Sequence, residues 1–261
     1  MTALRRNLPA IVVFFTTLVL WEVVISSLDV RSFILPAPSS IANALVENWD
    51  VGYQIWPAAQ TTFLEAAGGM VIGTVLGVLI ALVISRWTLA GDIALPVAVA
   101  ISAIPIIAFA PIANNWFGVL SPTSKMVIAA VLVFFPIMIN VLRGLTEVPN
   151  SSLELMRSYA AGSMAVFRKV RVPNALPFFL TGLKVGTTLA LIGAVVGEYF
   201  GGLNVALGRI VVQSASRLSF EVTWAAIIVA SVVGIAMYLL IVAIERVAIP
   251  WHPAVRGDRI S

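Results

Sequence analysis

Six long apolar stretches dominate the sequence and constrain its fold more than any other feature. About 20 consecutive apolar residues form a helix long enough to cross the hydrocarbon core of a bilayer. Of the 261 residues, 60% are hydrophobic and 11% are charged, whereas about a quarter are charged in a soluble domain. We therefore predict an all-α polytopic membrane protein, with about six transmembrane helices in a single domain over residues 1–261. The predicted spans cover about residues 9–28, 58–85, 93–113, 123–142, 177–199 and 223–245.

The distribution of basic residues predicts how the chain is oriented. Cytoplasmic loops of membrane proteins carry an excess of Lys and Arg. With the N-terminus in the cytoplasm, twelve of the 16 basic residues fall on the cytoplasmic side, and four fall outside: Arg31, Lys125, Arg209 and Arg217. This split predicts a multi-pass protein of the cell (inner) membrane with both termini cytoplasmic. It also explains the +4 net charge without a nucleic-acid partner.

Prolines predict an irregular third span. Pro96, Pro105 and Pro111 all fall in it, and a proline removes a helical hydrogen bond. We expect this span to be kinked or broken.

Residues 36–49 are predicted to form a short surface helix that begins at a Pro-Ser-Ser sequence.

Small residues recur every four positions in the second and fifth spans. Such stripes let helix backbones approach closely in a membrane. Two explanations stay open, packing within the chain or packing at a subunit interface. The stripes are Gly69, Gly73 and Gly77 in the second span, and Gly182, Gly186, Ala190 and Ala194 in the fifth.

The longest connection on the predicted cytoplasmic side covers about residues 143–176. Ser151 and Glu154 have the spacing of a capping box, which predicts a helix beginning near Ser152. Glu154 could instead pair with another protein. The connection ends at Pro177, which suits the first turn of the fifth span.

A second short helix is predicted within the same connection. Gly162 interrupts the first helix, Ser163 is expected to cap the second, and Pro173 is expected to stop it. The apolar side chains of Met164 and Phe167 then lie outside the bilayer, where they need a partner surface. A groove of another protein could provide it, or the helix could lie on the lipid headgroups.

Residues Glu154–Pro173 resemble the "EAA" loop of ABC importer permeases. That pattern reads Glu-Ala-Ala, three residues, Gly, nine residues, then Ile-x-Leu-Pro. Glu154, Val170, Val172 and Pro173 match it without a gap.

Three positions depart from the EAA pattern. Leu155 and Met156 replace the two alanines, and Ala160 replaces the glycine. Because alanine disfavours the conformation of a tight turn, we expect Gly162 to supply the flexibility in its place.

Further segments resemble the branch of this permease family that imports nitrate, sulfonates, taurine or thiamine-related pyrimidines. In chain order they cover most of the sequence from residue 35 onward. They are Leu35–Ser39, Ile104–Pro111, Trp116–Gly118, Phe134–Pro136, Gly144–Leu145 and Gly197–Gly201.

The resemblance implies the fold, the partners and the mode of action. It implies a type I ABC importer permease fold and a dimer of two permease subunits, expected to be a homodimer. It also implies a cytoplasmic ATPase dimer that binds ATP and Mg, and an extracytoplasmic substrate-binding protein. This chain would then bind no cofactor and would be a transport subunit, not an enzyme. The substrate stays open among a sulfonate, taurine, nitrate and a vitamin or pyrimidine-like compound.

Two sets of residues are candidates for function. The first, implied by the resemblance, is the ATPase-coupling loop: Glu154, Arg157, Ala160, Ala161, Gly162, Ser163, Met164, Phe167, Val170, Val172 and Pro173. The second is the translocation pathway: Glu198, which follows the small-residue stripe of the fifth span, together with Asn114 and Asn115. These two asparagines replace what is usually an apolar pair in the resembling family, and they either tune the substrate or only wet the outer end of the third span. Ionisable side chains within a span are costly and often functional.

The remaining ionisable residues of the spans are given structural roles. We expect Lys184 to extend to the inner interface. Glu22 and Glu65 are expected to face a partner helix or to lie near water.

Two other classes of protein compete with a permease. A membrane-embedded enzyme needs convergent catalytic or metal-ligating side chains. The chain has one histidine, His252, and no cysteine, so we predict neither a catalytic nor a metal site. A small secondary transporter or channel not coupled to an ATPase is the stronger alternative, because broken helices serve such proteins too.

Overall fold

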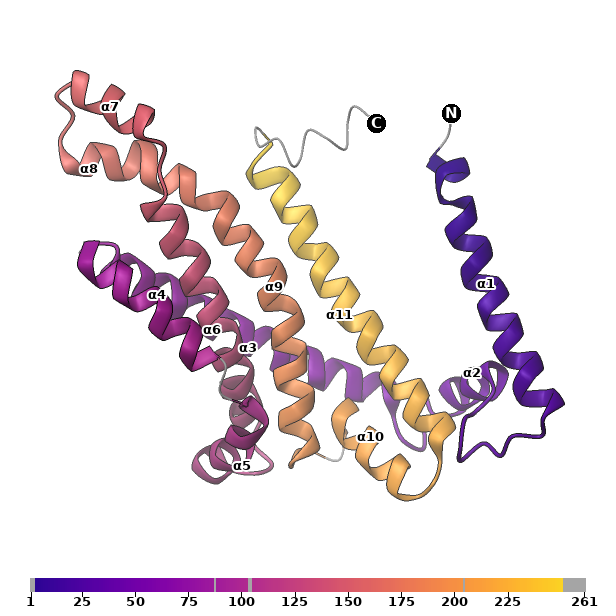
Figure 1. Cartoon of the computed structure of the whole chain (residues 1–261). Coiled ribbons are helices and arrows are strands. Elements are labelled where there is room, and N and C mark those ends of the chain that lie inside the picture. Colours follow the sequence, from indigo (N-terminus) through magenta and orange to yellow (C-terminus); the bar gives the residue numbers. More distant parts are fainter. Residues whose placement is uncertain (1–2, 87, 103–104, 204, 251–261) are drawn as a thin grey trace. The chain divides into compact units, whose positions relative to one another are not determined.

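The computed structural model describes residues 3–86, 88–102, 105–203 and 205–250, and every regular element in these ranges is helical (Figure 1). The predicted all-α fold is therefore confirmed. Ile104 of the resembling segments, and His252 with the rest of the C-terminal tail, lie outside the described residues.

Five helices of the described chain are long and apolar enough to cross a membrane. A bent pair, α4 and α5, brings the number to six if the pair forms one span. The spanning helices are α1 (Ala3–Ser27), α3 (Ile55–Ile84), α6 (Pro122–Thr146), α9 (Val172–Tyr199) and α11 (Phe220–Ala248). The prediction of about six spans agrees with this range.

The third predicted span is broken, as expected. The last part of α4 (Thr88–Ser102), from Pro96 to Ser102, and helix α5 (Ile106–Phe117) differ in direction by 79°. Pro105 occupies the N-cap position of α5, with extended backbone. Pro96 and Pro111 lie inside the two helices, so only Pro105 of the three prolines falls at the break.

The contacts divide the chain into two compact units. The first contains residues 1–61 and 204–231, and the second contains residues 62–203 and 232–261. The first unit holds two short helices, α2 (Pro38–Glu47) and α10 (Leu207–Ser216). Helix α2 confirms the predicted surface helix near residues 36–49, whereas the sequence pattern gave no sign of α10.

Glu22 of α1 explains where α2 begins. Its carboxylate accepts hydrogen bonds from the Ser39 amide at 3.0 Å and from the Ser39 hydroxyl at 2.7 Å. Ser39 lies in the first turn of α2, where backbone N–H groups lack helical partners and a negative charge is favourable. Glu22 therefore faces a partner helix, one of the two outcomes expected from sequence.

Helix α6 is the centre of the second unit. A Cβ atom added at Gly73 of α3 would lie 2.5 Å from the Ala130 carbonyl oxygen, and one added at Gly193 of α9 would lie 2.6 Å from Ala129 Cα. Both stripes of small residues, on α3 and on α9, face α6. Packing within the chain thus accounts for them.

Candidate functional site

The connection from α6 to α9 forms an exposed elbow, a name used here for residues 147–171. It contains α7 (Asn150–Ser158), α8 (Ser163–Val166) and the π-helical segment η1 (Phe167–Arg171). Figure 1 shows α7 and α8 at one end of α6 and α9. None of these three elements has a buried residue. The Leu155, Tyr159 and Met164 side chains are 57%, 74% and 59% exposed, so the elbow presents apolar groups beyond the spans.

The predicted caps of the elbow helices are wrong. Helix α7 begins at Asn150, with Pro149 in the N-cap position and no side-chain cap. Ser151 is already inside the helix, whereas a capping side chain must come from the residue just before it. Gly162, not Ser163, precedes α8, again without a side-chain cap. Glu154 is left exposed on α7.

The tight turn of the elbow lies at Ala160, and the expectation that Gly162 would supply it is wrong. Ala160 has a positive φ of 49°, and Gly162 has a φ of −67°. The Ala161 amide donates to the Met156 carbonyl at 3.0 Å, and the Ala160 amide donates to the Arg157 carbonyl at 2.9 Å. These two bonds form a Schellman motif, in which glycine is the usual residue at the left-handed position. Alanine stands where the EAA pattern has that glycine.

Pro173 does not stop the helix that begins in the elbow. The helix runs without a break from Ser163 to Tyr199 through α8, η1 and α9. Just before Pro173, the Val172 amide donates to the Phe167 carbonyl, five residues back. A π-turn of this kind widens the helix and makes room for the proline ring next to it. Pro177 lies inside α9 as well, not in its first turn.

A second set of contacts fixes the base of the elbow. The Asn174 amide group donates to the Gly144 carbonyl at 2.8 Å and to the Glu147 carbonyl at 3.2 Å. Gly144 also packs directly against Ala175. The end of α6 and the start of α9 are thus held together, so the elbow has a firm attachment at both of its ends.

The residues predicted for the coupling loop all lie on the elbow or at the first turn of α9. Phe167 packs against the core of the second unit, and Ala161 and Val170 are half-buried. The others are exposed and form the outer surface: Glu154, Arg157, Ala160, Gly162, Ser163, Met164, Val172 and Pro173.

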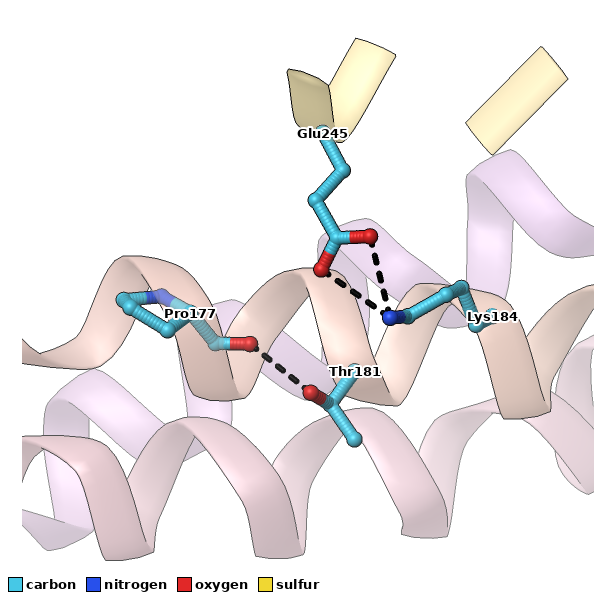
Figure 2. A network of polar contacts seen from close by, with 4 residues as sticks. All are labelled: Pro177, Thr181, Lys184 and Glu245. Atoms are coloured by element: carbon cyan, nitrogen blue, oxygen red, sulfur yellow. Dashed lines mark hydrogen bonds and ion pairs between the residues drawn. The ribbon is translucent and has the colours of Figure 1, made fainter. Parts of the chain in front are cut away.

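An ion pair joins α9 to α11 within the second unit. Lys184 Nζ lies 2.9 Å and 3.0 Å from the two carboxylate oxygens of Glu245 (Figure 2). The Lys184 and Glu245 side chains are only 25% and 12% exposed. The sequence predicted that Lys184 would extend to the inner interface. In the structure its charge is paired with Glu245, a residue that the sequence analysis did not single out. Figure 2 also shows the Thr181 hydroxyl donating to the Pro177 carbonyl, at 2.9 Å.

A buried polar cluster lies at the opposite end of α6 from the elbow. Lys125 and Glu198 are 0% exposed, Glu65 is 2% exposed and Asn114 is 4% exposed. Lys125 Nζ donates to the Asn114 side-chain oxygen at 3.4 Å and to the Val119 carbonyl. The Glu65 and Glu198 side chains lie within hydrogen-bonding reach of each other, and the Lys125 charge acts on both.

The buried cluster joins parts of the chain that the sequence separates widely. It connects α3, α5, the start of α6 and the end of α9. Of the three pathway candidates, the structure brings Glu198 and Asn114 into this cluster. Asn115 is exposed and stands apart from it. Lys125, predicted to lie outside the membrane, is the residue that sequence reasoning missed.

A metal centre has no obvious place in the described part of the chain. No group of three or more His, Cys, Asp or Glu side chains there has a suitable arrangement. What the geometry offers is an exposed, partly apolar surface at one end of α6 and a buried charged cluster at the other.

Comparisons with known proteins give a consistent result. The family model described as "Binding-protein-dependent transport system inner membrane component" matches residues 73–248. A probable ABC transporter permease protein of Haemophilus influenzae is 29% identical over 236 residues, which cover 90% of this chain and 94% of that protein. The formylaminopyrimidine transport permease protein of Halalkalibacterium halodurans is 32% identical over 240 residues, covering 92% and 94%.

A solved structure has a similar fold. An inward-facing MetNI methionine ABC transporter matches with a TM-score of 0.50 and 23% identity, covering 72% of this chain and 93% of the matched chain. At this level of identity the match concerns the fold alone.

Proposed function

This chain belongs to the family of inner membrane components of binding-protein-dependent transport systems, and from that premise we propose that its elbow couples the membrane helices to a separate cytoplasmic ATPase. The family and the permease fold expected from the EAA-like segment are confirmed. The chain is accordingly a permease subunit of an ABC importer, a transport subunit of the inner membrane. The proposal concerns how it is driven and what it carries.

The observation that carries the proposal is the exposed apolar surface of the elbow. Leu155 and Met164 lie on two short helices on either side of the Ala160 turn, each more than half exposed. An amphipathic helix with such groups suits a hydrophobic groove of a partner protein. The Ala160 turn also fixes the direction of α8, which favours a protruding knob over a helix lying flat on headgroups.

The continuous helix from Ser163 to Tyr199 supplies the mechanical link. A push or pull on α8 passes into α9 without a flexible joint, and α9 packs along α6. Conformational change in transporters is largely rigid-body movement of such packed elements. In this mechanism the partner binds ATP and Mg, closes, and moves the inner ends of the permease helices.

The proposed assembly contains two copies of this chain, an ATPase dimer and an extracytoplasmic binding protein. The cargo is a small nutrient of the class named by the resembling branch: a sulfonate, taurine, nitrate or a vitamin or pyrimidine-like compound. One relative is named as a formylaminopyrimidine transport permease, and this similarity favours a vitamin or pyrimidine-like compound. We place substrate selection chiefly on the binding protein.

The proposal is tested by two measurements on the purified importer. One is its association with the ATPase, and the other is ATP-dependent uptake by vesicles that contain the importer. Leu155→Glu and Met164→Glu should each weaken association with the ATPase by roughly 30-fold or more, the effect of losing an interface hot spot. Val51→Glu is the matched control, because Val51 is 75% exposed and belongs to the connection between α2 and α3, not to the elbow.

Two results would contradict the proposal. One is unchanged ATPase binding in both elbow variants. The other is uptake that proceeds at full rate without ATP, which would support the alternative of a secondary transporter or channel.

A further inference from the structure

An open groove of about 980 Å³ lies in the second unit. It is lined by α3, α6 and α9 and by Phe167 of the elbow. Among the residues whose side chains the structure describes, the lining contains no acidic residue and a single basic one, Arg86. The remaining walls are almost entirely apolar. They include Val78, Leu82, Val83, Leu145, Phe167 and Phe179.

Arg86 is the basic residue of this groove lining. It is exposed, and the described residues offer its guanidinium group neither a hydrogen bond nor an ion pair. It follows Ile84, the last residue of α3, by two positions. Because α3 is long enough to cross a bilayer, Arg86 lies at the depth where the hydrocarbon gives way to phosphate headgroups.

We propose that this groove binds one anionic phospholipid, with an acyl chain between the apolar walls and the headgroup phosphate on Arg86. The apolar walls match an acyl chain in chemistry. The planar guanidinium can donate two parallel hydrogen bonds to a phosphate.

Basic residues that neighbour the groove lining along the chain favour an anionic lipid over a zwitterionic one. Arg168, Lys169 and Arg171 of η1 follow directly on Phe167, which lines the groove. Basic pockets between transmembrane helices are known to hold anionic headgroups. A phosphatidylglycerol headgroup keeps its net negative charge, whereas phosphatidylethanolamine carries a compensating ammonium.

A second copy of this chain is a less suitable occupant. A protein surface that covered the groove would bury the Arg86 charge, which is costly unless a carboxylate accompanies it. Lipid molecules in the leaflet bring a phosphate to that depth in every case. The inference needs only that the chain is in a membrane, so it stands or falls independently of the ATPase.

The headgroup part is tested by lipid retention. The purified protein is placed in vesicles of equal phosphatidylglycerol and phosphatidylethanolamine, extracted in mild detergent, and weighed by native mass spectrometry. Arg86→Gln should lower the ratio of retained phosphatidylglycerol to phosphatidylethanolamine about fivefold, the effect of losing one contact between a basic side chain and an anionic headgroup. Arg143→Gln, an equal change at an exposed arginine outside the groove, should leave the ratio unchanged.

The acyl-chain part is tested by filling the groove. Val83 and Val75 are 54% and 51% exposed on the same helix, but only Val83 lines the groove. Val83→Trp should reduce retention of both lipids, and Val75→Trp should not. Excess inorganic phosphate should not displace the bound lipid, because phosphate lacks the chain.

Several outcomes would overturn the proposal. They are equal effects of the two arginine variants, equal effects of the two valine variants, displacement by phosphate alone, or a disulfide between two copies through a cysteine placed at Val83. Thermal unfolding of each variant shows whether it is folded. If Arg86→Gln does not fold, the valine pair still decides the result.

Discussion

Ala160 has a backbone conformation in which glycine would be the more stable residue. Its φ of 49° is in the left-handed region, where an alanine costs roughly 1 kcal/mol more than a glycine. We predict that Ala160→Gly raises the stability of the elbow by about that amount. The measurement is protection of the elbow from proteolysis, together with thermal unfolding of the purified protein.

Ala161→Gly is the control for this prediction. Ala161 is the next residue and does not have a positive φ, so the added chain freedom should destabilise it slightly. If both glycine variants shift stability in the same direction, the Schellman turn at Ala160 is not what limits the elbow.

The second prediction for a single residue concerns Lys125. It is the positive charge of a cluster that contains Glu65 and Glu198, all of them buried. Removing one partner from a buried charged set costs about 3–5 kcal/mol. Lys125→Met should therefore destabilise the protein strongly, and Glu198→Gln should recover part of the loss in the double variant. Thermal unfolding of the two single variants and the double variant measures the coupling, and strictly additive effects would show that the residues act separately.

The same cluster shows what sequence alone could predict about the site. Glu198 was selected because an ionisable residue in an apolar helix is unusual, and that signal is local. Lys125 and Glu65 carry the same signal near the ends of other apolar stretches. Their meeting depends on how α3, α6 and α9 pack, which no spacing along one helix reveals. Asn115 was selected with Asn114 as a pair, but neighbouring positions on a helix point about 100° apart.

At the scale of the element, the packing of α9 on α6 depends on glycines. A Cβ atom at Gly193 would lie 2.6 Å from Ala129 Cα, whereas a Cβ atom at Gly162 would meet nothing within 4 Å. We predict that Gly193→Ala costs about 1–3 kcal/mol through overpacking, and that Gly162→Ala leaves stability nearly unchanged. Thermal unfolding compares them. Equal effects would mean that α9 shifts away from α6 without cost.

The elements themselves were predictable to different degrees. Apolar stretches predict helices well, because a backbone in lipid has only its own groups to bond with. The start of the fifth span was not predictable in this way. Pro173 and Pro177 normally indicate a helix end or first turn, but the π-turn at Phe167–Arg171 accommodates Pro173 and lets the helix continue. A proline pattern does not show whether a wider turn precedes it.

At the scale of the whole molecule, the orientation predicted from basic residues has a direct test. Helix α6 has 25 residues, a length of about 37 Å, which exceeds the roughly 30 Å hydrocarbon core. Leu120 precedes α6 and Met164 follows it in the elbow, and both are exposed. They should therefore lie on opposite sides of the membrane.

The chain has no cysteine, so single substitutions give clean labels for this test. In intact cells, a membrane-impermeant maleimide should label Leu120→Cys and leave Met164→Cys unlabelled until the membrane is opened. That pattern follows from the predicted orientation, in which twelve of the 16 basic residues lie on the cytoplasmic side. The elbow then faces the compartment that holds ATP. The reverse labelling pattern would place the elbow outside the cell, where no ATPase could drive it, and the proposed mechanism would fail even though the fold and the family stand.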